Sequence, residues 1–264
     1  MVRPLSARNP RVQRLARLGR RREERAAERA FLVEGPVLVA AALAAGAAVT
    51  EVFVAADATD RPAVADVVSS LPPDVAAWEL PPGVLDRIGD VTTSQGVIAV
   101  VSSVEATWPD PERAPFVVVL AELGDPGNAG TLIRTAAAAG AGAVVIAGGV
   151  DAFSPKVVRA SAGAIFTIPV VEAATPLAAV STLTSLGYGV HAASVREGRS
   201  VFEAPLEPPL AVVLGNEAHG LDPEVVAACA DAITVPMAGA TESLNVAMAG
   251  TVICFEVLRR GGAS

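Results

Sequence analysis

The sequence has little of what membrane-spanning and secreted proteins depend on. Its longest charge-free runs, 36–50 and 135–150, are shorter than the roughly 20 apolar residues that span a bilayer. The Arg-rich N-terminus is not followed by the apolar stretch of a secretory signal. Two cysteines, Cys229 and Cys254, stand in apolar helical patterns, which predicts buried, reduced thiols. We therefore expect a cytoplasmic globular protein without a membrane span.

Patterns for metal and nucleotide binding are also missing. There are no clustered carboxylates, no His pair and no Cys set, so we expect no metal site. Neither GxGxxG nor GxxxxGK(S/T) occurs in the Gly-rich segment 124–130, which disfavours dinucleotide and nucleoside-triphosphate chemistry. Of the two histidines, His191 lies in a predicted strand and should pack in the core. His219 lies in a predicted loop, where we expect no chemical role.

Positive charge is scarce overall but concentrated at the N-terminus. The formal net charge is -8, and nineteen of the twenty basic residues are arginine. Residues 1–30 hold ten arginines and three glutamates, a net of +7, and the remainder carries −15. Codon usage can enrich arginine but does not cluster it. The pattern predicts that a polyanion binds at this end. The alternative is that these arginines only form a solvated helix face.

Two α/β domains are expected. A helix is predicted from Pro10 to about Ala30, and alternating strands and helices up to residue 102 indicate a small α/β sandwich. Residues 103–115 contain three prolines and no periodicity, which is typical of a linker. The apolar run 116–123 is typical of a strand buried on both faces. We place the domains at 1–104 and 116–264, with a linker at 105–115.

The second domain alternates strands with helices. Helices are predicted at 131–139, 155–162, 176–186 and 223–230, and strands at 143–147, 166–171, 188–194 and 210–215. The stretch 232–259 then predicts a buried strand, a Gly-containing loop and a long helix that begins at Glu242-Ser243. Ser243 and Asn245 suit a helix start, where side-chain oxygens meet free backbone N–H groups. Polar atoms therefore gather at that helix end.

Two further loops carry candidate chemistry. The loop at 124–130 offers glycines and Asn128 before a predicted helix, a general anion site, and Arg134 lies within that helix. A structural Arg134 is the alternative, because a desolvated guanidinium needs a partner. Glu217 follows the apolar strand 210–215, at the strand end where open α/β sheets bind ligands. An ordinary turn acid is equally compatible with that position.

The segments NAGTLIRTA (128–136), LGNEAHGL (214–221) and VPMAGATESLNVAMAG (235–250), taken together, resemble the three signature motifs of the SpoU (TrmH) family of RNA ribose 2'-O-methyltransferases. NPRVQRLARL (9–18), FLVEG (31–35) and TSQGVIAVV (93–101) are similar to the RNA-binding N-terminal domain of many members. The resemblance covers nearly the whole chain.

The resemblance implies a C-terminal SPOUT α/β domain with a trefoil knot and a mostly parallel sheet, preceded by the smaller RNA-binding α/β sandwich. It implies a homodimer with S-adenosylmethionine in the knot and the active site at the dimer interface. The implied catalytic and substrate-orienting residues are Asn128, Arg134, Glu217, Ser243 and Asn245. The implied cofactor contacts are Ala193, Ser194, Leu214, Gly215, Gly220, Val235, Met237 and Leu244. The segment SPKVVRASAGAIF makes Arg159 an RNA or interface residue, and Arg14, Arg17, Arg21 and Arg25 are the expected RNA contacts of the N-terminal helix.

The residue types suit transfer of a methyl group to a ribose hydroxyl, a weak nucleophile that must be aligned and lose its proton. The pKa of a guanidinium, above about 12, makes Arg134 a poor base, so we expect it to position phosphate and stabilise charge. We expect an rRNA substrate. A tRNA 2'-O-methyltransferase is the second possibility, and a non-catalytic RNA-binding or ribosome-assembly protein of the same fold is the third. A Rossmann oxidoreductase is a distant alternative, because its fingerprint is missing.

Overall fold

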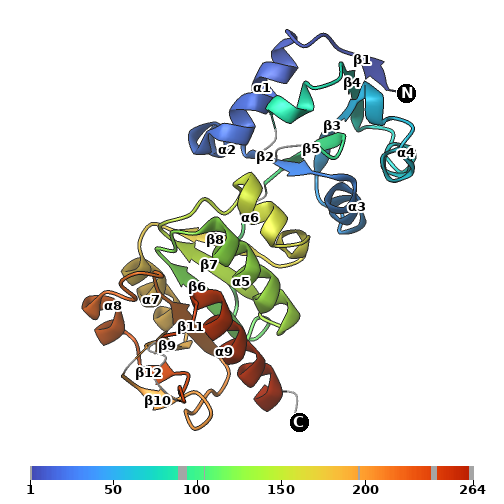
Figure 1. Cartoon of the computed structure of the whole chain (residues 1–264). Helices are drawn as coiled ribbons and strands as arrows, with labels where there is room; N and C mark the ends of the chain where they lie inside the picture. The colour runs from blue at the N-terminus through green and yellow to red at the C-terminus, as the bar shows by residue number, and fades with distance from the viewer. Residues whose placement is uncertain (1, 89–93, 104, 196, 239–242, 262–264) are drawn as a thin grey trace. The chain divides into compact units, whose positions relative to one another are not determined.

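The computed structural model describes residues 2–88, 94–103, 105–195, 197–238 and 243–261 (Figure 1). The chain divides into two compact units. The N-terminal unit comprises Met1–Glu105 and Phe153–Phe166, and the C-terminal unit comprises Ala106–Ala152 and Thr167–Ser264. Both are α/β structures, as expected. Within the described ranges no helix is long and apolar enough to cross a membrane.

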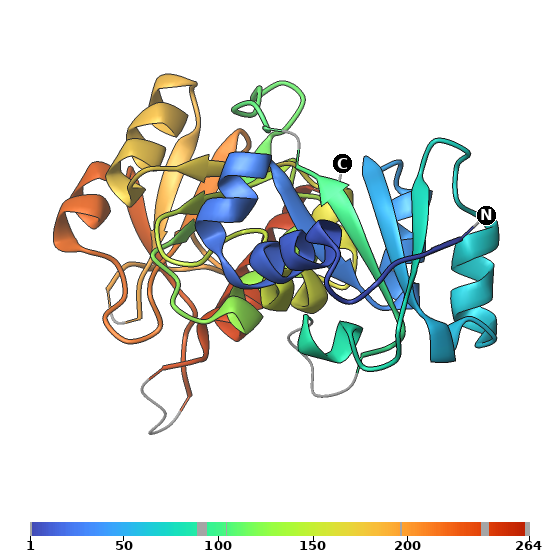
Figure 2. The same cartoon turned by 90° about the horizontal axis from the view of Figure 1, so that it is seen from above.

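The N-terminal unit is built on a five-stranded mixed sheet in the order β1-β4-β3-β5-β2. In Figure 2 its strands stand between α1 on one side and α4 on the other, so both faces are covered. Its strands are β1 (Arg3–Pro4), β2 (Ala30–Glu34), β3 (Val49–Ala55), β4 (Ala76–Leu80) and β5 (Val97–Ser102). Its helices are α1 (Pro10–Arg20), α2 (Arg22–Glu28), α3 (Pro36–Ala44), α4 (Pro62–Ser69) and α6 (Pro155–Ala160), with short 3-10 turns η1 (Ala56–Ala58), η2 (Leu85–Arg87) and η3 (Ala164–Phe166).

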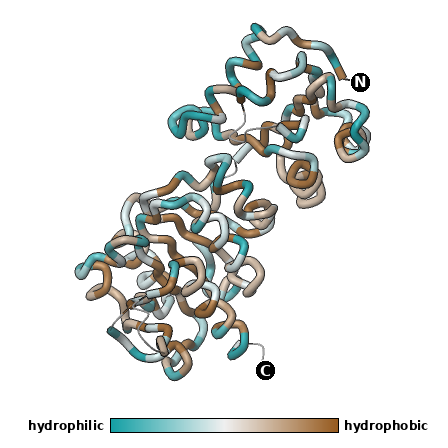
Figure 3. The backbone as a smooth tube through the Cα atoms, in the orientation of Figure 1, coloured by the Kyte–Doolittle hydropathy of each residue, from teal (hydrophilic) through white to brown (hydrophobic). Residues whose placement is uncertain are grey.

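The prediction of a single helix from Pro10 to about Ala30 is wrong, because the structure has two helices there. The chain turns at Arg21, whose backbone is extended (φ -118°, ψ 120°), and α1 and α2 lie on either side of it. The buried Val12, Leu15 and Leu18 anchor α1. The sequence of α2, REERAAE, contains no large apolar residue, so it cannot continue that buried stripe. Figure 3 shows α2 as hydrophilic and α3 as more hydrophobic.

The segment Phe153–Phe166 does not belong to the unit expected from the sequence, because the predicted limits placed it in the C-terminal domain. It packs with the N-terminal unit instead. Aromatic stacking holds the segment there: the Phe31 ring of β2 stacks with the Phe153 ring at 4.8 Å between centroids and with the Phe166 ring at 6.4 Å. The limits 1–104, 105–115 and 116–264 otherwise stay a proposal.

The C-terminal unit is built on a seven-stranded parallel sheet in the order β10-β12-β9-β11-β6-β7-β8. This confirms the predicted mostly parallel sheet; the trefoil knot stays a prediction. Its strands are β6 (Phe116–Ala121), β7 (Ala143–Ala147), β8 (Val170–Ala173), β9 (Gly189–Ala193), β10 (Arg199–Ser200), β11 (Leu210–Leu214) and β12 (Asp231–Thr234). Its helices are α5 (Pro126–Ala138), α7 (Pro176–Ser185), α8 (Pro223–Ala228) and α9 (Val246–Gly261).

The two faces of this sheet carry different helices. Figure 1 shows α5 and α9 side by side on one face, with α7 and α8 on the other. Val119, Val213 and Leu183 belong to the core beneath α7 and α8. The strands β6 and β11 are neighbours, but β6 leads into α5 and β11 leads into α8. The helices that follow them therefore lie on opposite faces of the sheet.

Element boundaries in this unit differ from expectation at three places. The helix expected at 131–139 begins earlier, at Pro126, because the Asp125 carboxylate accepts a hydrogen bond from the Asn128 N–H at 2.9 Å and caps it. Strand β8 begins at Val170 rather than residue 166. The helix expected to open at Glu242-Ser243 begins at Val246; Glu242 lies outside the described residues.

Close packing of α9 on α5 depends on Gly250. A β-carbon added there would lie 2.4 Å from Leu132 and 2.8 Å from Leu214, both buried. The two helices run parallel, and the Thr135 and Thr251 hydroxyls meet at 3.3 Å. Their N-termini therefore lie at the same edge of the sheet.

The two cysteines and His191 are found where expected. Cys254 is buried and Cys229 is partly buried, both as free thiols. Burial raises the pKa of Cys254 to about 12 and that of Cys229 to about 11, so both stay protonated at neutral pH. His191 is buried, and that burial lowers its pKa against an opposing effect of Asp231.

Candidate functional site

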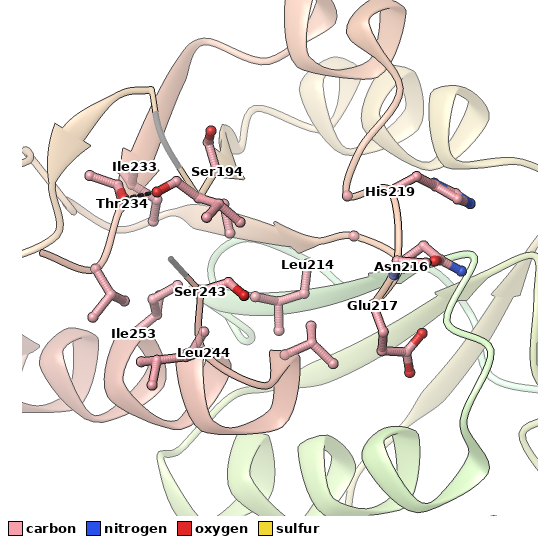
Figure 4. A pocket seen from close by; sticks show the side chains of 18 of the residues that line it. Ser194, Leu214, Asn216, Glu217, His219, Ile233, Thr234, Ser243, Leu244 and Ile253 are labelled. Carbon is pink, nitrogen blue, oxygen red and sulfur yellow. Dashed lines mark hydrogen bonds between the residues drawn. The ribbon is translucent and has the colours of Figure 1, made fainter. Parts of the chain in front are cut away.

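A cavity of about 450 Å³ lies at the carboxyl ends of three neighbouring strands of the C-terminal unit, β9, β11 and β12, against the start of α9 (Figure 4). Its volume is in the range of small-molecule sites, about 300–1,000 Å³. The structure brings together here all eight residues predicted to contact a cofactor: Ala193, Ser194, Leu214, Gly215, Gly220, Val235, Met237 and Leu244.

The wall of the cavity has an apolar part and a polar part. Leu214, Ile233 and Ile253 form a buried apolar floor. In Figure 4, Asn216, Glu217 and His219 stand at one end, and Ser194, Ile233 and Thr234 at the other. A ligand with one flat apolar portion and one charged portion fits such a division.

Gly215 shapes the rim of the cavity. A β-carbon on it would lie 2.5 Å from the carbonyl carbon of Gly220, closer than real contacts allow. The loop between them is closed by Asn216 and Gly220, which exchange backbone hydrogen bonds of 3.0 and 2.9 Å. The absence of a side chain at residue 215 therefore permits the tight turn that presents Asn216 and Glu217.

Glu217 connects the loop after β11 to the loop after β6. Its Oε2 accepts a hydrogen bond from the Gly124 N–H at 2.9 Å. Its Oε1 accepts from the Asp125 N–H at 3.1 Å and from Asn128 Nδ2 at 2.9 Å. The carboxylate thus holds the first turn of α5 from two backbone positions and one side chain.

These hydrogen bonds determine the protonation of Glu217. Partial burial raises its pKa, but the hydrogen bonds from Asn128 and from backbone N–H groups together outweigh burial, and the net pKa is lowered. All three donors are N–H groups, which stabilise the charged carboxylate. Glu217 is therefore ionised at neutral pH, as a structural acceptor and not as a proton donor.

Asn128 and Asn245 extend this network to α9. Asn245 Nδ2 donates to Asn128 Oδ1 at 3.1 Å, although the residues are 117 positions apart. Asn245 Oδ1 accepts from the N–H groups of Ala247 at 2.9 Å and Met248 at 3.4 Å, which caps α9 as its sequence position predicts. Asn245, Asn128 and Glu217 form one continuous chain of hydrogen bonds across all three motif segments.

Ser243 and Arg134 occupy different places. Ser243 lines the cavity beside Leu244, as predicted for the start of the last motif. Arg134 lies on the exposed side of α5 and is not among the residues that line the cavity. Among the residues that the structure describes, Arg134 makes no hydrogen bond or ion pair. The partner that a structural arginine would need is therefore not observed within this chain.

Sequence reasoning missed Asn216. Its Nδ2 donates to the Glu122 carbonyl at 2.8 Å, and its Oδ1 accepts from the Ala218 N–H at 2.8 Å. Glu122 has a positive φ of 52°, uncommon for a residue with a side chain. Asn216 thereby supports a strained bend just before the loop that Glu217 holds. In the sequence, only its position between Gly215 and Glu217 could have indicated a role for Asn216.

The arginines predicted to bind RNA are largely engaged within the N-terminal unit. Arg14 forms ion pairs with Glu28 and with Glu51, the latter at 2.7 Å. Arg17 pairs with Glu24 at 3.3 Å. The pairs with Glu28 and Glu24 are only partly shielded from water, so phosphate can compete with these two carboxylates for Arg14 and Arg17.

Arg25 and Arg159 are not free on the surface. Arg25 is buried and donates a hydrogen bond to the Leu18 carbonyl, which stabilises the corner between α1 and α2. Arg159 lies 3.8 Å from the buried carboxylate of Glu34. Arg21 is exposed at the corner itself. Of the predicted RNA contacts, Arg21 is therefore the most accessible.

Among the described residues, no group of three or more His, Cys, Asp or Glu side chains is arranged to hold a metal ion. The side chains around the apolar floor are neutral amides, hydroxyls, the His219 imidazole and one carboxylate.

The fold and the site define an α/β protein with a small-molecule cavity at the carboxyl edge of a parallel sheet and an arginine-rich unit before it. Residues 115–255 match the SpoU rRNA Methylase family, and residues 9–99 match the MRM3-like substrate binding domain. The chain belongs to the SpoU rRNA Methylase family.

The chain is similar to characterised proteins over nearly its whole length. It is 33% identical over 253 residues to the 23S rRNA (guanosine(2553)-2'-O)-methyltransferase RlmP of Bacillus subtilis, covering 96% of this chain and 97% of that protein. Among solved structures, the SpoU methyltransferase AviRb of Streptomyces viridochromogenes in complex with AdoMet is 27% identical, with a TM-score of 0.85 over 97% and 100% of the two chains. The AdoMet-bound rRNA methyltransferase of Sinorhizobium meliloti is 28% identical, with a TM-score of 0.84 over 98% of each chain.

Proposed function

We propose that the protein is an S-adenosylmethionine-dependent RNA ribose 2'-O-methyltransferase that acts on rRNA. One observation carries the proposal: the cavity and the chain Asn245–Asn128–Glu217 lie at the same edge of the sheet, so a cofactor and a substrate-orienting network adjoin. Family membership supports the chemistry, and the relative of matching length that carries an rRNA-methyltransferase name supports the substrate.

The residues of the cavity fit S-adenosylmethionine. The apolar floor of Leu214, Ile233 and Ile253 suits an adenine ring, and the hydroxyls and backbone groups around Ser194 and Ser243 suit polar groups. When bound, this cofactor supplies an electrophilic methyl group. The protein's own part is to hold the cofactor and to orient a ribose hydroxyl toward it.

Four of the five predicted catalytic residues are suited to orienting the substrate ribose. Asn128 and Asn245 are neutral groups whose remaining hydrogen-bonding capacity can hold a ribose, and Ser243 adds a hydroxyl at the cavity wall. Glu217 acts through Asn128 and is a positioning residue. Arg134 binds the substrate phosphate and stabilises charge, while proton loss is assisted by that phosphate or by water.

The proposal includes a homodimer formed through α9. Met248, Phe255 and Leu258 leave 63%, 46% and 40% of their surface exposed along this helix. A line of large apolar side chains on one helix is costly to leave in water and suits a second copy of the same chain. Such a dimer brings exposed groups of α5, Arg134 among them, near an interface.

RNA attraction falls to the N-terminal unit, where the first 30 residues carry a net charge of +7. Arg14, Arg17 and Arg21 are the accessible members of the predicted contact set, and Arg25 and Arg159 support the fold around them. The proposal includes the predicted domain roles and the trefoil knot. It also assigns the protein to the cytoplasm.

The test is methyl transfer from radiolabelled S-adenosylmethionine to total rRNA and, separately, to total tRNA, with the modified nucleosides identified by mass spectrometry. We expect label in a 2'-O-methyl nucleoside of rRNA. Label in tRNA alone would favour the tRNA enzyme. Cofactor binding without transfer to either RNA calls for a repeat with ribosomal particles, and failure there too would favour a non-catalytic assembly protein.

A further inference from the structure

We propose that Arg3, Arg11 and Trp78, on one face of the N-terminal unit, form a binding site for an unpaired RNA nucleotide. The base stacks on the layer that Arg11 and Trp78 make, and the arginines pair with the flanking phosphates. The inference rests on the proposed function in taking RNA as the ligand. Arg3, Arg11 and Trp78 themselves lie outside the predicted set of RNA contacts, and Arg14 of that set adjoins them.

The sheet places these side chains together. Strand β1 runs parallel to β4 at the edge of the sheet, with Arg3 opposite Trp78, and Trp78 lies opposite Phe53 of β3. Side chains of residues that lie opposite one another point to the same face. Helix α1 begins over this face, and Asn9 caps it by accepting the Arg11 N–H at 2.9 Å. Figure 1 shows β1 and β4 beside each other, to the right of α1.

The indole ring is held in one orientation. Trp78 Nε1 donates to Glu51 Oε1 at 3.1 Å, and the same carboxylate accepts from Arg14 at 2.7 Å and pairs with Arg11 at 3.1 Å. The Glu51 side chain is only 13% exposed, so this junction is shielded from water. The ring therefore keeps its orientation before any ligand arrives, which lowers the entropy lost on binding.

A stacking layer is already formed. The guanidinium of Arg11 lies over the indole at 4.8 Å from the ring centroid, and that of Arg3 lies at 5.9 Å. Arg11 keeps 46% of its side chain exposed, so part of this layer is accessible to a ligand. Nucleobases stack on arginine planes and on aromatic rings alike. Arg11 thus extends the aromatic surface outward and adds charge to it.

The charge of this surface suits phosphate. Arg3, Arg11 and Arg14 converge here against two carboxylates: Glu51 pairs with Arg11 and Arg14, and Glu28 pairs with Arg14. Arg3 forms no ion pair with an acidic residue in the part of the chain that the structure describes, so its charge is available. A duplex keeps the faces of its bases inside the stack, so they cannot stack on a protein side chain. The site therefore selects unpaired nucleotides, such as those of an rRNA loop.

The protein itself provides a reporter for the test. It contains two tryptophans, Trp78 and Trp108. In a Trp108→Phe variant the tryptophan fluorescence, excited where tyrosine does not absorb, comes from Trp78 alone. This full-length variant is titrated with a short single-stranded oligoadenylate and with a duplex RNA of the same length. We expect the single strand to quench Trp78 and the duplex to quench it far less.

Substitutions in that background test the arginines. We expect Arg11→Ala to weaken single-strand binding about fivefold or more, the lower end of base-stacking effects. Arg3→Ala should weaken it less and flatten its salt dependence. Arg61→Ala is the matched control, because Arg61 is another exposed arginine of the same unit, just before α4, and should bind as the parent does.

Several results overturn the inference. Equal quenching by duplex RNA removes the selection for unpaired nucleotides. Binding that is salt-sensitive but does not quench Trp78, or that Arg61→Ala weakens as much as Arg11→Ala, assigns the surface to general charge attraction or to an acidic protein.

In wild-type background, Arg3→Ala should raise KM for rRNA and leave kcat unchanged. Because the fluorescence assay needs no cofactor, quenching without methyl transfer would reject the proposed function and keep this site.

Discussion

At the scale of single residues, the site is characterised by side chains that hold one another. Asn128 uses both ends of its amide, one toward Glu217 and one toward Asn245. Such a bridge has little freedom to move, so a bound ribose meets a prepared surface. Residues at the ends of the bridge should therefore affect the rate more than cofactor affinity.

Replacing Glu217 with Gln should slow methyl transfer about tenfold or more, because an amide N–H then faces the N–H donors of Gly124, Asp125 or Asn128. The carboxylate acts in its charged form, and its pKa is lowered. Activity of the wild type should therefore persist as the pH falls to the ordinary range of a glutamate and decline only below it. Rate measurements with cofactor and RNA saturating provide the check. An unchanged kcat for the variant would remove Glu217 from the network's function.

Replacing Arg134 with Ala should abolish detectable methyl transfer, a loss of about a hundredfold or more, since it removes a charge-stabilising donor. Arg134 is exposed and lies outside the cavity wall, so cofactor affinity should change by no more than a few-fold. Isothermal titration with S-adenosylhomocysteine measures the affinity. Loss of cofactor binding in parallel with activity would contradict the assigned role.

At the scale of elements, the end of α9 is fixed to a neighbouring loop. The Glu256 carboxylate accepts hydrogen bonds from Arg259 at 2.8 Å and from Arg260 at 2.7 Å. Arg260 in turn donates to the carbonyls of Val201 and Ala204. This cluster fastens the loop after β10 to the helix, on the same unit as the cavity.

Acid should weaken this cluster in a defined pH range. The hydrogen bonds from Arg259 and Arg260 lower the pKa of Glu256 to about 2. Its stabilising contribution is therefore complete above the pKa of an unfolded glutamate, about 4.3, and is lost as the pH falls through about 2. Thermal unfolding of the wild type and Glu256→Gln over this range should show two curves that converge in acid. Curves that stay parallel would contradict the assignment.

At the scale of the whole molecule, α9 has two different sides. Ile253, Cys254 and Val257 are buried against the sheet and α5, whereas Met248, Phe255 and Leu258 are exposed. A helix that is apolar on both sides is typical of one that packs against something on each. The proposed second copy supplies the missing partner.

Replacing Phe255 with Glu should convert the proposed dimer into a monomer, because it places a charge within the apolar contact. Val37→Glu is the control: Val37 is 76% exposed on α3 in the other unit, and its change should leave the mass in solution unaltered. Light scattering coupled to size exclusion gives the mass. A wild-type protein that is already monomeric, or a Phe255→Glu variant that stays dimeric, would reject this interface.

The sequence by itself determined the parallel sheet and the place of the site. Strands made of buried apolar runs alternate with helices, and polar residues follow β6, β11 and β12, whose carboxyl ends share one edge. Any parallel arrangement of those strands brings Asn128, Glu217 and Asn245 to that edge. Local patterns also fixed the cap at Asn245 and the burial of His191.

Only the tertiary structure decided which of these groups touch and which arginines are available. The bridge between Asn128 and Asn245, the burial of Arg25 and the layer of Arg11 on Trp78 join segments far apart in the chain or depend on packing between elements. Periodicity reports which side of an element is apolar, because burial repeats along a helix or a strand. It carries no information about the partner that each side chain meets, since that is set by packing between elements.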